Sequence, residues 1–144
     1  MKNITPGDQV RILFEYGTSA MQIQLEHRGT GVFGGNETEL ICSFIEESKE
    51  EIISLQIVAA NGTTSTFEPI VLFRPNGDAN LTKVDGYLRG RVELNNSINE
   101  SRHITLKFTY LICADENDYK CRIWYFDNFN QIMKETETSK IIVQ

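Results

Sequence analysis

The feature that most constrains the fold of this chain is a series of short β-type segments, each bounded by residues that favour turns. Alternating or β-branched and aromatic patterns mark the segments Gln9–Tyr16, Met21–Glu26, Thr38–Ile45, Ile52–Ala59, Phe67–Phe73, Gly90–Leu94, His103–Leu111, Tyr119–Phe126 and Lys140–Val143. Turn-forming sequences such as Asn61-Gly62-Thr63 and Pro75-Asn76-Gly77-Asp78 lie between them. Helical periodicity is almost absent, so the pattern predicts an all-β sandwich or barrel.

The length of the chain limits it to one domain. With 144 residues, of which 40% are hydrophobic, the chain can build one sizeable core but hardly two. We assign residues 21–144 to this domain. Residues 1–20 form either an extra strand at a sheet edge or a lead-in to the domain. The Asn61-Gly62 pair predicts a hairpin that joins Ile52–Ala59 to Phe67–Phe73.

The charge distribution argues against several classes of partner. The formal net charge is −6, and the Lys and Arg residues are scattered along the chain. Nucleic acids and anionic membranes attract proteins through basic patches, so neither is expected as the main partner. No apolar stretch approaches the roughly 20 residues that a membrane-spanning helix needs. We therefore expect no direct membrane insertion by this segment.

Six Asn-x-Ser/Thr sequons indicate an extracellular protein, either secreted or the ectodomain of a cell-surface protein. Most of them fall at expected turns or strand ends, where a bulky polar glycan can be accommodated. Chance occurrence in an Asn-rich cytosolic chain is the weaker alternative. On this interpretation Met1 is an added start residue on a segment whose signal peptide has been removed. The expected N-glycosylation sites are Asn3, Asn36, Asn61, Asn80, Asn95 and Asn99.

The sequence lacks the motifs of enzymes and of metal sites. It has three cysteines and two histidines, without Cys-x-x-Cys, Gly-x-Ser-x-Gly, His-Glu-x-x-His or a phosphate-binding glycine loop. Asp115, Glu116 and Asp118 would offer hard oxygens to Ca²⁺, but solvated turn carboxylates are the better interpretation. We expect no catalysis, no cofactor and no metal.

The stretch that leads to the last cysteine resembles the region between the E and F strands of V-set immunoglobulin domains. Asp115 stands six residues and Tyr119 two residues before Cys121. Upstream, Gly90-Arg91-Val92 resembles the D strand, and Cys42 lies in an alternating segment like the B strand. The apolar positions that the family has before this cysteine are filled by Leu106, Phe108 and Leu111. The resemblance covers residues 22–143 and implies a two-sheet immunoglobulin-like sandwich with Greek-key connections.

The resemblance implies structural roles for particular residues. Cys42 and Cys121 would form a disulfide between the sheets, worth on the order of 4 kcal/mol in the chain-entropy model. Tyr119 would form a tyrosine corner, and Arg91 would pair with Asp115. The core tryptophan of the family is missing, and Leu55 takes its place. The last strand also lacks the Gly-x-Gly bulge of the family, which argues against antibody-style pairing. These departures indicate a divergent, invertebrate type.

Cys113 has no partner in this scheme. We expect a free buried thiol first, a disulfide to another chain second, and mispairing with Cys42 last, because Cys113 should sit at the far end of the sandwich.

The same scheme predicts a binding surface. If Cys121 points inward, alternation turns Arg122, Trp124 and Phe126 outward. They would lie on the outer side of the GFCC′ sheet, through which V-set domains often recognise partners, and such residue types dominate interface hot spots. No sequon lies between Ser101 and Gln144, so this surface should be free of glycans. The alternative is that neighbouring strands or a long loop at 127–139 cover Trp124.

We therefore expect an extracellular recognition or adhesion domain that binds a protein through this face, in self/non-self or immune recognition. A second copy of the chain is the favoured partner. The resemblance extends to cnidarian allorecognition ectodomains and to the immunoglobulin modules of molluscan fibrinogen-related immune proteins. The alternative function is a soluble glycan- or pathogen-binding immune module that uses the 127–139 loop, and a viral decoy receptor is a third.

Overall fold

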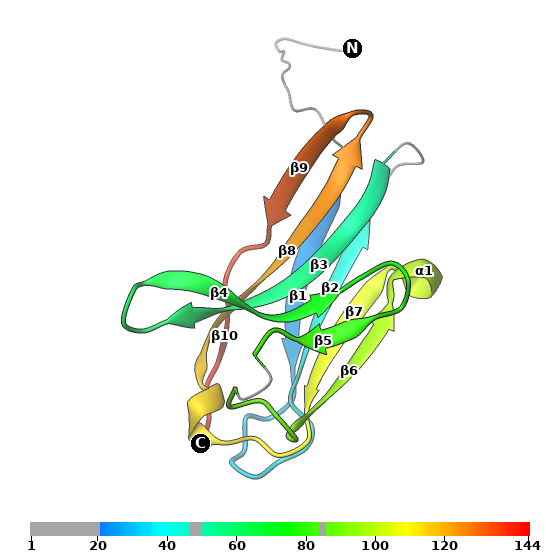
Figure 1. Cartoon of the computed structure of the whole chain (residues 1–144). Coiled ribbons are helices and arrows are strands. Elements are labelled where there is room, and N and C mark those ends of the chain that lie inside the picture. The colour runs from blue at the N-terminus through cyan, green and yellow to red at the C-terminus, as the bar shows by residue number, and fades with distance from the viewer. Residues whose placement is uncertain (1–20, 47–49, 84–85) are drawn as a thin grey trace.

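The chain folds into two antiparallel sheets that pack face to face (Figure 1). The computed structural model describes residues 21–46, 50–83 and 86–144; Asn3 and the predicted strand Gln9–Tyr16 lie outside them. The smaller sheet has the order β1 (Gln22–Arg28), β2 (Glu39–Ile45), β7 (His103–Phe108) and β6 (Val92–Ser97). The larger sheet has the order β10 (Ser139–Ile141), β8 (Asn117–Asp127), β3 (Glu50–Asn61), β4 (Thr66–Phe73) and β5 (Ala79–Leu81), and β9 (Asn130–Glu135) also pairs with β8.

The connections between the sheets follow a Greek-key pattern. The chain passes from β2 in the smaller sheet to β3 in the larger one, and later from β7 to β8. As a result β2 pairs with β7 and β3 pairs with β8, although each pair is far apart in the sequence. The predicted all-β, two-sheet sandwich is confirmed.

Alternating side chains from both sheets build the core. In β8 the residues Tyr119, Cys121, Ile123 and Tyr125 are fully buried, while those between them are not. The smaller sheet contributes Leu40, Cys42 and Phe44 from β2 and Ile104, Leu106 and Phe108 from β7. A disulfide joins Cys42 to Cys121 with their Cα atoms 6.3 Å apart, so a covalent link spans the two layers.

Several elements differ from those that the sequence predicts. The segment 127–139 is not a long loop, because its first part forms a hairpin with β8 that ends in β9. β5 and the short helix α1 (Ile98–Ser101) were not predicted. The predicted β3–β4 hairpin is present, but its turn spans residues 62–65, and Ser65 rather than Gly62 has a positive φ. Four residues reverse the chain there instead of a tight two-residue turn.

The last strand of the larger sheet is broken into β9 and β10. Thr136 lies at the break: its backbone N–H donates to the Cys121 carbonyl at 2.9 Å, and its hydroxyl accepts from the Cys121 N–H at 3.0 Å. A side chain thus takes the place of a backbone acceptor and keeps both polar groups of Cys121 satisfied. None of the helices formed by the described residues has the length and apolar character needed to cross a bilayer.

Candidate functional site

The side of the larger sheet that faces away from the core carries the predicted binding residues. We call this side the outer sheet surface and define it by the residues of β8 and β9 that point away from the core. In the β8–β9 register Arg122 lies opposite Glu135, and Trp124 lies opposite Met133. Residues directly opposite in an antiparallel pair share a face of the sheet. The outer sheet surface consists of Lys120, Arg122, Trp124 and Phe126 of β8 and Gln131, Met133 and Glu135 of β9.

Half of the outer sheet surface is a fixed charge network. The Arg122 Nε donates to a carboxylate oxygen of Glu135, and the Lys120 Nζ lies 3.6 Å from the other oxygen. Arg122 also donates to the Phe67 carbonyl at 3.3 Å, and the Lys120 Nζ lies 4.5 Å from the centre of the Phe67 ring. The hydrogen bond from Arg122 lowers the pKa of Glu135. Arg122 is therefore held within the sheet and does not reach freely into solvent.

The other half of the outer sheet surface is mainly apolar, with Gln131 opposite Phe126 as its polar member. Trp124 is half-buried and points outward, with Ser54 of β3 on one side and Met133 of β9 on the other. Phe126 and Met133 are 37% and 39% exposed. Neighbouring strands thus cover Trp124 in part, and no loop folds over it from 127–139, because that segment continues the sheet.

Phe129 extends the apolar half beyond the sheet. It lies with Asn128 in the two-residue turn between β8 and β9, and its side chain is 98% exposed. Asn128 has a φ of 61°, a left-handed conformation that asparagine tolerates better than most residues. Sequence reasoning missed Phe129 and Met133 because it treated this segment as a loop. The sequence signal was limited to the turn-forming residues Asp127 and Asn128, without the glycine that usually marks a two-residue hairpin turn.

The residues expected to stabilise the turn before β8 lie together at the end of the sandwich where the chain ends. The Tyr119 hydroxyl donates to the Asp115 carbonyl at 2.6 Å, and burial raises the pKa of Tyr119. Two Nη atoms of Arg91 donate to the Asp115 carboxylate, which is fully buried. The hydrogen bond to Asp115 raises the pKa of Arg91. This cluster shapes the fold and is not open to a ligand.

Leu55 and Cys113 have distinct environments. Leu55 is fully buried and lies in register with Ile123 on one side and Phe73 on the other, in the middle of the core. Cys113 is a free thiol at the start of the 3₁₀ helix η1 (Cys113–Asp115). It is exposed, so the expectation that this thiol is buried was wrong. The short helix turns it outward while Asp115 turns inward.

The turn carboxylates each have their own partner. Glu116 accepts a hydrogen bond from the Val143 N–H at 2.9 Å, and Asp118 lies 3.3 Å from the Lys140 Nζ. With Asp115 bound to Arg91, the three carboxylates are engaged with protein groups.

The sequon asparagines of the described residues lie off the outer sheet surface. Four of them, Asn36, Asn80, Asn95 and Asn99, are exposed in the 29–38 loop, on β5, on β6 and in α1. Asn61 is half-buried at the end of β3. Glycans at these positions remain a prediction, but none of these side chains belongs to the residues that define the outer sheet surface.

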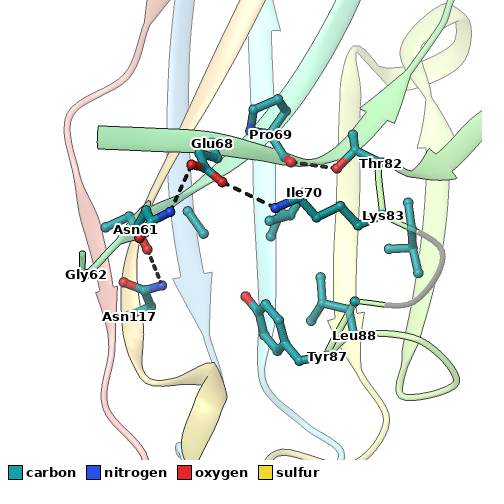
Figure 2. A pocket seen from close by; sticks show the side chains of 14 residues that line it. Asn61, Gly62, Glu68, Pro69, Ile70, Thr82, Lys83, Tyr87, Leu88 and Asn117 are labelled. Atoms are coloured by element: carbon teal, nitrogen blue, oxygen red, sulfur yellow. Dashed lines mark hydrogen bonds and ion pairs between the residues drawn. The ribbon is translucent and has the colours of Figure 1, made fainter. Parts of the chain in front are cut away.

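A pocket of about 280 Å³ opens at the β4–β5 edge of the larger sheet (Figure 2). Ile70, Tyr87 and Leu88 give it an apolar wall, and Glu68 and Lys83 line its polar side. Sequence reasoning did not point to this pocket, because it forms only where the β3–β4 hairpin meets residues 81–83 and 86–88 in the folded protein.

Comparison with known proteins places the fold but not the partner. No protein-family model and no curated protein matches the sequence. The chain is similar to the solved structure of murine CRIg, an immunoglobulin-type domain, with a TM-score of 0.67 and 17% identity over 85% of this chain and 98% of that one. In total 1512 solved chains match. A fold shared so widely establishes an immunoglobulin-like sandwich and leaves function to be argued from the surface.

Proposed function

We propose that this domain is an extracellular recognition module that binds protein through the apolar half of its outer sheet surface. The observation that carries this proposal is Phe129, which is 98% exposed at the tip of the same β8–β9 hairpin that carries Trp124, Phe126 and Met133. Contiguous exposed apolar side chains are typical of interaction sites, and aromatic residues supply much of the binding energy at interfaces.

Two further observations support an extracellular binding role. The Cys42–Cys121 disulfide is a feature of proteins that fold in oxidising compartments. The β8–β9 hairpin lies at the end of the molecule opposite to the C-terminus (Figure 1), so its tip is clear of that terminus. Among the sequons of the described residues, none falls on β8 or β9. Asn80 shares the outward face of the larger sheet through the register of Arg122, Gln56, Leu72 and Asn80, but it lies on the edge strand β5.

We propose a second copy of the chain as the partner. The net charge of −6 opposes self-association in general, because like charges repel. Trp124, Phe126, Phe129 and Met133 carry no charge, so two copies can meet through them about a two-fold axis without like charges in contact. The Arg122–Glu135 pair at the border carries both signs and suits a self-complementary rim. Such a contact would serve adhesion or self-recognition.

Sedimentation velocity over a concentration series tests this proposal. We expect the wild-type protein to self-associate and Phe129→Ser and Trp124→Ala to be monomeric at the same concentrations. Ile45→Ser is a matched control, since Ile45 is 66% exposed on the smaller sheet, and it should behave as wild type. A wild-type protein that stays monomeric throughout, or an Ile45→Ser variant that loses association equally, would refute self-binding through this surface.

The alternative function loses its structural basis. A glycan- or pathogen-binding module was expected to use a long loop at 127–139, but residues 130–135 form β9 and pair with β8 along its length. Residues 127–135 therefore belong to a hairpin with a two-residue turn, and the long loop on which the alternative depends is absent there.

A further inference from the structure

The pocket at the β4–β5 edge combines an apolar wall with hydrogen-bonding groups at its mouth. Figure 2 shows Glu68 between Asn61 and Lys83, with the ring of Tyr87 directed toward the space below them. The Asn61 Nδ2 donates to one oxygen of Glu68 at 2.9 Å, and the Lys83 Nζ lies 3.4 Å from the other. Its volume of about 280 Å³ is just below the roughly 300–1,000 Å³ typical of ligand pockets, which suits a single ring better than an extended ligand.

The pocket opens on the inner side of the larger sheet. Glu68 pairs with Ala59, and Ala59 pairs with Tyr119, whose side chain lies in the core. Residues paired across antiparallel strands share one face, so Glu68 points to the core side at the end of the sheet. Lys120 and Phe67 contact each other on the opposite face. A group held in the pocket therefore lies on the other side of the sheet from the outer sheet surface.

Asn61 is at once a wall of this pocket and the asparagine of a sequon. Its Oδ1 accepts hydrogen bonds from the Thr63 N–H at 2.9 Å and from the Thr63 hydroxyl at 2.6 Å. This fixes the amide plane and directs Nδ2 toward Glu68. An asparagine amide has two N–H hydrogens, and N-glycosylation replaces one of them. The remaining hydrogen can keep the bond to Glu68 while a sugar occupies the other position.

We propose that the pocket is the seat of the first sugar of an N-glycan on Asn61. A pyranose ring has an apolar face that can pack on the Tyr87 ring and the Ile70 side chain, both of which line the pocket. Its hydroxyl groups can donate to Glu68 and accept from Lys83. Tyr87 is 39% exposed in the protein, and a seated sugar would cover part of this aromatic surface.

The seat has a consequence for recognition. Asn61 ends β3, the strand next to β8, so a freely moving glycan on it could sweep over the outer sheet surface. Seating the first sugar on the inner side directs the glycan away from Trp124. The inference rests on the extracellular location in the proposed function, but it does not depend on self-association.

Two measurements on protein secreted from a eukaryotic host test the seat. Peptide mapping by mass spectrometry should find Asn61 glycosylated. After endoglycosidase trimming to one N-acetylglucosamine per site, nuclear Overhauser effects should connect the N-acetyl methyl group on Asn61 to the Tyr87 ring. The sugar on Asn95, an exposed residue of β6, is the matched control and should show no such contact to a remote side chain.

Hydrogen exchange gives a readout that does not depend on assigning the sugar. Asn61→Gln should speed amide exchange in 81–83 and 86–88 several-fold, whereas Asn95→Gln should leave these segments unchanged. An unmodified Asn61, or a modified Asn61 without Overhauser contacts and without altered exchange in Asn61→Gln, would overturn the inference. Phe129-dependent self-association would persist in that case, so failure of the seat is distinguishable from failure of the proposed function.

Discussion

Arg91 and Asp115 form two parallel hydrogen bonds, with Nη1–Oδ2 at 2.8 Å and Nη2–Oδ1 at 3.0 Å, although the Asp115 side chain is completely buried. The guanidinium also donates to the carbonyls of Tyr87 and Tyr110, and Asp115 accepts from the Ile112 N–H at 2.8 Å. The pair thus links the segment before β6 to η1 and to the segment that precedes η1. Its energetic role is that of a shielded ion pair, not of a surface salt bridge.

Loss of Asp115 should destabilise the domain strongly. Asp115→Ala leaves the Arg91 guanidinium partly buried without its counter-charge, and breaking such a pair costs about 3–5 kcal/mol. Urea denaturation measures the change in the free energy of unfolding. Glu26→Ala, which removes the exposed pair between Glu26 and Arg28, is the control and should cost under about 1 kcal/mol. Equal losses in the two variants would contradict this assignment.

Removal of the Tyr119 hydroxyl should have an intermediate effect. Tyr119→Phe keeps the buried ring but leaves the Asp115 carbonyl without this donor, which costs about 1–3 kcal/mol. Tyr110→Phe serves for comparison, because Tyr110 is 50% exposed and solvent can replace its hydroxyl contacts. Thermal unfolding should therefore show a lower melting temperature for Tyr119→Phe alone. A melting temperature equal to wild type would mean that the corner does not stabilise the fold.

Leu55 should not be replaceable by the tryptophan that the resemblance would place there. The core is packed around the leucine side chain. Leu55 lies in register with Ile123 and Phe73, and all three residues are fully buried. Leu55→Trp should cost about 1–3 kcal/mol by overpacking, and Leu55→Ala about 2–5 kcal/mol by opening a cavity. Calorimetry on both variants checks these values. Stabilisation by Leu55→Trp would show that the core holds unused space.

Acid should weaken the charge network of the outer sheet surface. The pKa of Glu135 is lowered in the folded protein, chiefly by the hydrogen bond from Arg122. Its stabilising contribution is therefore complete above the ordinary glutamate value of 4.5 and is lost as the pH falls through the lower folded value. The stability difference between wild type and Glu135→Gln should shrink between about pH 6 and about pH 3. A difference that stays constant over this range would exclude the linkage.

The exposure of the Cys113 thiol can be checked by its chemical reactivity. In the folded protein a thiol reagent should modify one cysteine per chain, at Cys113, while Cys42 and Cys121 stay bridged. Cys113→Ser should abolish the reaction without reducing stability. Absence of reaction in a protein that also runs as a dimer without reductant would instead show that Cys113 is bridged to another chain.

The alternation of residues 119–126 was enough to place Trp124 and Phe126 on the outside, because a strand beside a core exposes every second residue. The β9 strand was not predicted because its apolar and polar residues alternate only weakly. Met133 is exposed, and Ile132 and Lys134 are only half-buried. The turn before β9 also contains no glycine. The ion pair that holds Arg122 could not be predicted from the sequence either, because Glu135 is brought opposite Arg122 only by the β8–β9 register. The pocket depends on two segments that meet only in three dimensions.

Trp124 is the only tryptophan of the chain, and the alternation along β8 places it outside the core, whose central position is held by Leu55. Indole emission is sensitive to the polarity around the ring, so in this protein the optical signal comes from the surface and not from the interior. A partner that covers the ring will shift this emission toward shorter wavelengths. The fluorescence of Trp124 can therefore report binding at the outer sheet surface without an added label.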